Sequence, residues 1–154
     1  MTDYSSKLDE IRTKLKVDFV AIAFPEDLFS GDAISWNYVS GNLNDKFKRI
    51  HLRRGKGIAG QVLKTGRPCI EQDVLNSTLY KETFRFPIIA FEKLTSFIAL
   101  PLWKYNKAVG VILIGNRNQI YLPTSLVDDL ELYIRTDLTP FYEKDVFNVE
   151  KQPN

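Results

Sequence analysis

Two neighbouring apolar segments constrain the fold more than any other feature of the sequence. Residues 96–103 and 108–114 are short and strongly apolar, and both have the composition of strands. The stretch Tyr105-Asn106-Lys107 separates them and has a suitable length to close a hairpin. Because a hairpin joins antiparallel strands, the core of this chain is expected to form on an antiparallel sheet.

Three further segments predict strands. Residues 18–24 are apolar on both faces, which suits a central strand better than a helix, and Pro25 would end it. In residues 34–38 large side chains alternate with polar ones, the pattern of a half-buried strand. Residues 68–70 predict a short third strand.

A helix is predicted near each end of the chain. Residues 5–16 carry an apolar stripe at helical spacing, and a second such stripe runs over residues 126–138. Pro140 would kink or end the second helix. Each helix start offers a serine and an aspartate at the spacing of a capping box: Ser6 with Asp9, and Ser125 with Asp128.

The middle of the chain predicts one short helix and one irregular segment. The helix would begin near Gly57 and end at Gly66, with Pro68 preventing its continuation. Residues 73–94 show no clear period, and a segment this long without regular structure is more often functional than idle.

These elements together predict an α+β fold in one domain. The sheet would carry the terminal helices on one face, while the short helix and residues 73–94 cover the other face above a ligand pocket. A length of 154 residues fits a single domain over 1–154, with its core at about 5–146 and a frayed C-terminal tail.

Composition excludes several functions. A formal net charge of +2 is too small to indicate a nucleic-acid-binding protein. Cys69 is the one cysteine and His51 the one histidine, so no disulfide within the chain and no cysteine metal cluster can form. The first residues lack the apolar segment of a signal peptide, and no apolar run could span a bilayer. We expect a cytoplasmic protein without a membrane segment, a metal or a cofactor.

The start of the predicted short helix is a candidate anion site. The first N–H groups of a helix have no partner within it, and the helix dipole makes this end positive. Such a start binds anions without any lysine or arginine. Gly57 would let a ligand or another backbone come close, and Ala59 would keep the wall small. Tight packing alone is the alternative role for these residues.

Three stretches within this order of elements resemble a GAF domain. They are residues 52–62, residues 65–68, and residues 99–103 continuing into 110–113. The resemblance spans nearly the whole chain. It implies a domain that binds a small ligand for signalling rather than an enzyme.

A narrower resemblance is to a family of stand-alone GAF proteins that act as nitrate receptors in staphylococci. It implies that a nitrate ion sits at the start of the short helix and that the protein acts on a sensor histidine kinase of a two-component system controlling nitrate respiration. By this resemblance, Ile58 and Ala59 would supply two helix amides. Pro87 and Ile88 would supply the opposing backbone, and Trp36 with Phe86 would form an apolar wall.

Other readings stay open. The domain could bind a different ligand, such as a cyclic nucleotide or a metabolite, or it could be an interaction domain without a ligand. A homodimer is possible. A redox enzyme is not expected, because free-methionine sulfoxide reductases share this fold but need cysteine chemistry, and Cys69 has no second cysteine to resolve a sulfenic acid.

Overall fold

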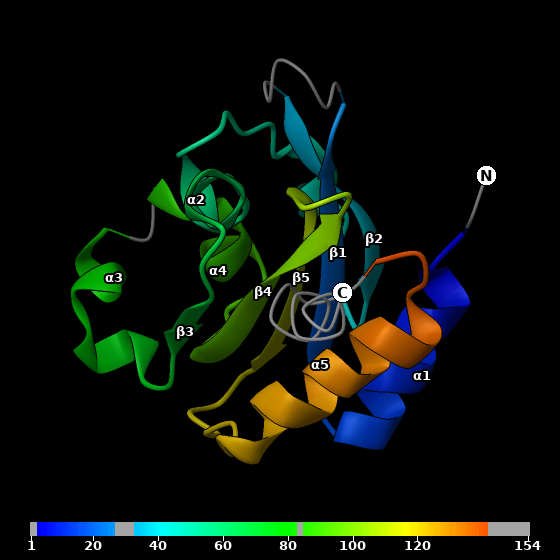
Figure 1. The fold of residues 1–154 in the computed structure, drawn as a ribbon. Coiled ribbons are helices and arrows are strands. Elements are labelled where there is room, and N and C mark those ends of the chain that lie inside the picture. The colour runs from blue at the N-terminus through cyan, green and yellow to red at the C-terminus, as the bar shows by residue number, and fades with distance from the viewer. Residues whose placement is uncertain (1–2, 27–32, 83–84, 142–154) are drawn as a thin grey trace.

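The chain forms an antiparallel sheet between two layers of helices (Figure 1). The computed structural model describes residues 3–26, 33–82 and 85–141. Its strands are β1 (Phe19–Pro25), β2 (Ile34–Ser40), β3 (Cys69–Glu71), β4 (Ser96–Lys104) and β5 (Lys107–Asn116). Its helices are α1 (Ser5–Leu15), α2 (Gly57–Thr65), α3 (Thr78–Lys81), α4 (Pro87–Phe91) and α5 (Ser125–Asp137), with two short 3-10 helices, η1 (Lys46–Arg49) and η2 (Val74–Asn76).

The sheet has the order β2-β1-β5-β4-β3, and every neighbouring pair of strands is antiparallel. β1 therefore lies inside the sheet, between β2 and β5, as its two apolar faces predicted. The predicted α+β class with an antiparallel sheet is confirmed.

The predicted hairpin is β4 with β5. The two strands pair from Ser96 opposite Asn116 to Lys104 opposite Lys107. Tyr105 and Asn106 form the turn, with φ angles of 54° and 61°. Two successive residues with positive φ are typical of the tight turn whose twist matches that of paired strands. The turn is therefore one residue shorter than predicted, because Lys107 already belongs to β5.

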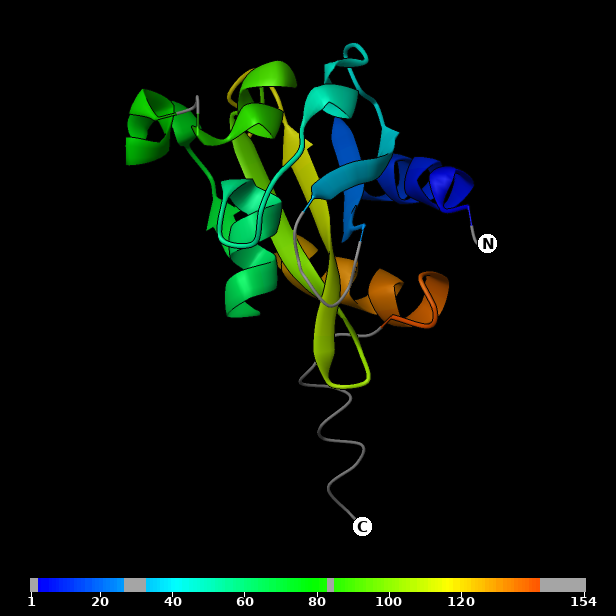
Figure 2. The same ribbon diagram turned by 90° about the horizontal axis from the view of Figure 1, so that it is seen from above.

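The sheet separates two apolar clusters, and alternate residues of each strand enter different clusters. In β1, Ala21 and Ala23 pack with residues of α2 and α4, whereas Val20 and Ile22 pack with residues of α1 and α5. Figure 2 shows α1 and α5 on one face of the sheet and α2 and α4 on the other. This arrangement confirms the terminal helices on one face and a separate cover on the opposite face.

Both predicted capping boxes are wrong. α1 begins at Ser5 and α5 at Ser125, and neither helix has a side-chain hydrogen bond from its N-cap residue. Ser6 and Ser125 lie inside the helices, so their hydroxyls are past the position from which a cap bonds to the first amides. Instead the carboxylate of Asp3 accepts a hydrogen bond from the amide of Ser5 at 2.9 Å.

Residues 73–94 are less irregular than predicted, because they contain η2, α3 and α4. Each of these helices is about one turn long, too short for an apolar period to appear in the sequence. At the C-terminus α5 ends at Asp137, before Pro140 as expected. The predicted frayed tail falls in 142–154, outside the described residues. None of the described helices has the length and apolar character needed to cross a membrane.

Candidate anion site

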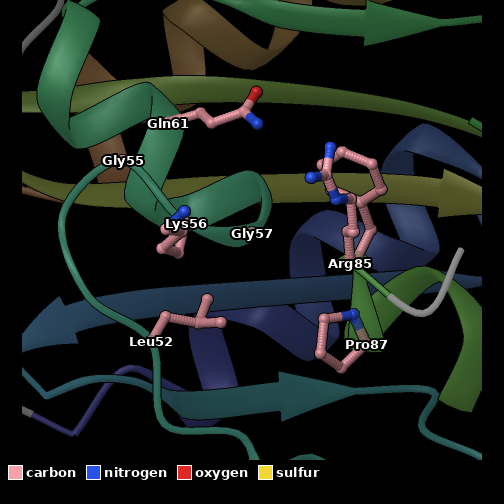
Figure 3. A pocket seen from close by; sticks show the side chains of 8 residues that line it. Leu52, Gly55, Lys56, Gly57, Gln61, Arg85 and Pro87 are labelled. Atoms are coloured by element: carbon pink, nitrogen blue, oxygen red, sulfur yellow. The ribbon is translucent and has the colours of Figure 1, made fainter. Parts of the chain in front are cut away.

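A pocket of about 430 Å³ lies between the first residues of α2 and those of α4 (Figure 3). It is on the predicted face of the sheet, the one that these two helices cover, but it lies within this cover and not between the cover and the sheet. Eight residues line it, and they come from the cover rather than from the strands: Leu52, Gly55, Lys56, Gly57, Gln61, Arg85, Phe86 and Pro87.

Glycines allow the chain to fold tightly where α2 begins. Gly57 has a φ of +66°, and a Cβ atom there would lie 2.8 Å from the Leu52 side chain. A Cβ on Gly60 would lie 2.3 Å from the carbonyl oxygen of Arg53. The amide of Gly55 donates to the carbonyl of Gly60 at 2.7 Å. The sequence predicted that a ligand or another backbone would come close to Gly57. In the structure the close neighbour is the Leu52 side chain.

The start of α2 presents backbone donors toward this region. Its N-cap residue, Lys56, makes no side-chain capping bond, although its own amide donates to the carbonyl of Arg53 at 2.9 Å. The next three amides, of Gly57, Ile58 and Ala59, stand at the positions that lack a partner within a helix. Partial positive charge accumulates at the same end of the helix.

The start of α4 faces the same pocket from the other side. Pro87 is its first residue and has no N–H group. The amides of Ile89 and Ala90 both donate to the carbonyl oxygen of Phe86, at 3.0 and 3.4 Å. The amide of Ile88 lies in the same first turn, where helix amides generally lack a partner within the helix.

Trp36 carries a further donor in the apolar cluster on this face of the sheet. Its indole Nε1 is buried, and within the described part of the chain it has no hydrogen-bond partner. The side chain is 3% exposed and belongs to the same apolar cluster as Ile58 and Phe86. A buried N–H without an acceptor costs about 1–3 kcal/mol. A bound acceptor in this cluster would remove that cost.

The rim of the pocket is cationic. Lys56 and Arg85 line it, and none of the eight lining residues is acidic. Arg85 pairs with Glu82 at 3.8 Å, but both side chains are more than half exposed, so this pair is weak. Two cations and the uncapped helix start together favour an anion.

The structure brings five of the six predicted site residues into one buried cluster: Trp36, Ile58, Ala59, Phe86 and Ile88. Phe86 also lines the open pocket, together with the sixth residue, Pro87. The remaining four are at most 3% exposed and do not line the pocket. Their contact with a ligand stays a prediction.

Sequence reasoning did not assign Gln61 and Arg85 to the pocket. Gln61 lies one turn into α2, and Arg85 directly precedes the predicted wall at Phe86. A cation next to a predicted ligand wall is a signal that could have identified Arg85.

The two residues with the most reactive side-chain types, Cys69 and His51, do not line this pocket. Cys69 is half-buried in β3, and its burial raises the pKa of its thiol, as does the nearby Glu71 carboxylate. His51 is exposed. No group of three or more potential metal ligands occurs among the residues that the structure describes.

This sheet, with one helix pair behind it and a ligand-sized pocket in front, defines a GAF domain. A GAF domain from an Acinetobacter phosphoenolpyruvate-protein phosphotransferase has the same fold, with a TM-score of 0.65 at 17% identity. The match covers 84% of this chain and 73% of that chain.

Two structures from Staphylococcus aureus give the narrower family: a hypothetical protein and the NreA protein, the latter mutated in its nitrate binding site. Each is 42% identical to this chain, with a TM-score of 0.75, and each match covers 79% of this chain. The match covers 98% of the hypothetical protein and 88% of NreA. The chain therefore belongs to the family of GAF proteins that includes NreA. Neither models of protein families nor curated protein sequences gave a match.

Proposed function

We propose that this protein is a nitrate sensor that binds the ion at the start of α2 and modulates a sensor histidine kinase controlling nitrate respiration. Ile58 and Ala59 would donate helix amides, Pro87 and Ile88 would form the opposing backbone, and Trp36 with Phe86 would form the apolar wall. One observation carries the proposal: the uncapped start of α2 occurs in a chain that is 42% identical to a protein with a nitrate binding site.

The chemistry of the site suits nitrate. Nitrate is a weakly hydrated monovalent anion, so moving it into an apolar cage costs less than moving a more strongly hydrated ion. A few N–H donors from α2 and the indole of Trp36 would satisfy its oxygen atoms. The same cage would reject sulfate, because its second charge and tighter hydration would be left uncompensated.

The size of the ligand limits its affinity. At a ceiling of about 1.5 kcal/mol for each of four heavy atoms, binding contributes at most about 6 kcal/mol, which corresponds to tens of micromolar. We expect a dissociation constant between tens of micromolar and the sub-millimolar range.

A thermal-shift titration tests nitrate binding. A ligand that binds the native state raises the melting temperature, and the increase grows with concentration. The purified protein would be titrated with nitrate, nitrite, chloride, sulfate and cyclic GMP, followed by calorimetry of any ligand that shifts it. The proposal requires a shift with nitrate at millimolar concentration and nitrate binding that sulfate does not displace. Absence of a nitrate-specific shift would overturn it.

The kinase partner needs a separate test. The host's sensor histidine kinase for nitrate respiration would be purified, and its autophosphorylation measured with this protein, with and without nitrate. A nitrate-dependent change in rate would support the role. An unchanged rate would limit this protein to nitrate binding.

A different small ligand is the alternative. The pocket of about 430 Å³ falls within the range of small-molecule sites. A shift with cyclic GMP, or with a metabolite and not with nitrate, would favour that reading. A redox enzyme fits less well, because the raised pKa of Cys69 opposes formation of the nucleophilic thiolate.

A further inference from the structure

The open pocket is larger than the proposed nitrate site requires. Its volume of about 430 Å³ has room for more than ten water molecules at ~30 Å³ each, whereas nitrate has four heavy atoms. Four of the residues proposed to hold nitrate are buried and do not line the pocket. The pocket is therefore an outer space that shares only Phe86 and Pro87 with the residues proposed to hold nitrate.

The outer space carries polar groups for which nitrate binding gives no role. Figure 3 shows Lys56 on the segment that leads into α2, Gln61 one turn further along that helix, and Arg85 across the gap on the segment that leads into α4. Nitrate in the cage would be held by backbone amides and the indole N–H, without a lysine or an arginine. Lys56 and Arg85 thus line the same pocket.

The charge in this space matches an anion with two negative charges. Lys56 and Arg85 contribute one positive charge each, and the lining contains no carboxylate to neutralise them. The pair between Arg85 and Glu82, at 3.8 Å and with both side chains over half exposed, is weak enough for Arg85 to turn toward a ligand. A guanidinium can hold two oxygen atoms of a carboxylate or phosphate at once, and the Gln61 amide can donate a further hydrogen bond.

We propose that the outer pocket is a second anion site, in which Lys56, Arg85 and Gln61 bind a dianion such as inorganic phosphate or a dicarboxylate. The inference goes beyond the proposed function, because it gives the domain a second ligand next to the proposed nitrate ion. Because the two sites share Phe86 and Pro87, a dianion in the outer site would cover the buried cage and slow the exchange of nitrate.

Calorimetry on the full chain tests this assignment with two probes, inorganic phosphate and succinate, each with and without saturating nitrate. The variants are Lys56→Gln and Arg85→Gln, singly and together. Lys48→Gln and Arg49→Gln are matched controls, because both residues are exposed cations on η1 that do not line the pocket.

We expect at least one probe to bind the wild type at millimolar concentration or below, and binding by one of them alone identifies the source of the dianion. Each pocket variant should weaken binding by about fivefold or more, since it removes a charge-assisted contact, and the control variants by less than about twofold. No binding of either probe at 10 mM, or equal losses in the control variants, overturns the proposal.

The two proposals fail in different ways. Phosphate or succinate binding that depends on Lys56 and Arg85, in a protein that does not bind nitrate, would remove the proposed function and keep this site. If the double variant binds nitrate and the wild type binds neither phosphate nor succinate, nitrate binding is kept and the second anion site is overturned.

Discussion

Arg117 binds Glu92 in the interior, with its Nη2 atom 2.8 Å from the Glu92 Oε1 atom. The Glu92 side chain is fully buried, and its Oε1 atom also accepts the amide of Leu43 at 2.9 Å. Arg117 donates in addition to the backbone carbonyls of Glu92 and Gly41, at 2.7 and 3.1 Å. This one side chain joins the end of β5 to the loop after β2 and to the end of α4, whose first residue lines the anion pocket.

Replacing Arg117 with methionine should destabilise the protein by about 3–5 kcal/mol, because it leaves the Glu92 carboxylate buried without its partner. Urea unfolding would measure the loss. The control is Glu10→Gln, which breaks the exposed pair of Glu10 with Lys14, also at 2.8 Å, and should have little effect on the free energy of unfolding because solvent screens this pair. Similar losses in both variants would show that burial of the Arg117 pair does not matter.

Replacing Glu92 with glutamine should change how stability depends on pH. Burial raises the pKa of Glu92 above its ordinary value of 4.5, although the Leu43 amide and Arg117 act in the opposite direction. As pH rises above 4.5, the Glu92 carboxyl loses its proton in the unfolded chain but keeps it in the folded protein. The free energy of unfolding therefore falls with rising pH until the folded carboxyl also ionises. The glutamine variant should therefore gain stability relative to wild type with rising pH across this window. Urea unfolding between about pH 4 and pH 8 measures the difference, and a constant difference would contradict the prediction.

Replacing Trp36 with phenylalanine should weaken nitrate binding about tenfold or more, because the indole N–H is lost as a donor to an anion. The empty protein should lose less than about 1.5 kcal/mol of stability, since the N–H that disappears has no partner among the described residues. Trp103→Phe is the matched control. Calorimetry that finds equal nitrate affinity in Trp36→Phe and wild type would remove Trp36 from the site.

Replacing Gly57 with alanine should both destabilise the protein and weaken anion binding. Its φ of +66° is unfavourable for alanine, and the added methyl would lie 2.8 Å from the Leu52 side chain, so we expect a loss of about 2–3 kcal/mol. Gly66→Ala is the control, with a similar φ of +67° at the far end of α2. It should lose stability without losing nitrate affinity. An equal drop in affinity would mean that general instability, and not the start of α2, governs binding.

Replacing Cys69 with serine should leave nitrate affinity unchanged, because this residue lies in β3 and belongs neither to the pocket lining nor to the residues proposed to hold nitrate. In the wild type the raised pKa of the thiol should make alkylation by iodoacetamide slower than that of a free cysteine at the same pH. Mass spectrometry over a pH series would follow the reaction. Alkylation at neutral pH faster than that of free cysteine would contradict the burial argument.

The sequence predicted the sheet and the terminal helices because their patterns are long. β4 and β5 have nine and ten residues, and the stripes of α1 and α5 run over three turns or more. α3 and α4 have four and five residues, which is too few for a period to show. The helix starts were placed correctly but their caps were not, since a shift of one or two residues moves a serine out of the capping position.

The candidate site was predictable where it depends on backbone. Gly57 is a readable signal of a helix start, and α2 begins there as predicted. The helix that begins at Pro87 was not predicted, because residues 73–94 were expected to be irregular. The cationic rim was not, because Lys56 and Arg85 are 29 positions apart and meet only through the fold. The buried pair of Glu92 and Arg117 was missed for the same reason.

The sheet also limits how a binding event can be transmitted. Because alternate residues of β1 enter different apolar clusters, no side chain of this strand touches both the pocket layer and the layer of α1 and α5. A signal between the layers has to travel as a displacement of strand backbone or around the rim of the sheet. The loop at residues 41–43 lies on the route around the rim. Arg117 and Glu92 form hydrogen bonds with its backbone, at Gly41 and Leu43. Arg12 of α1 donates a hydrogen bond to Ser40, directly before this loop.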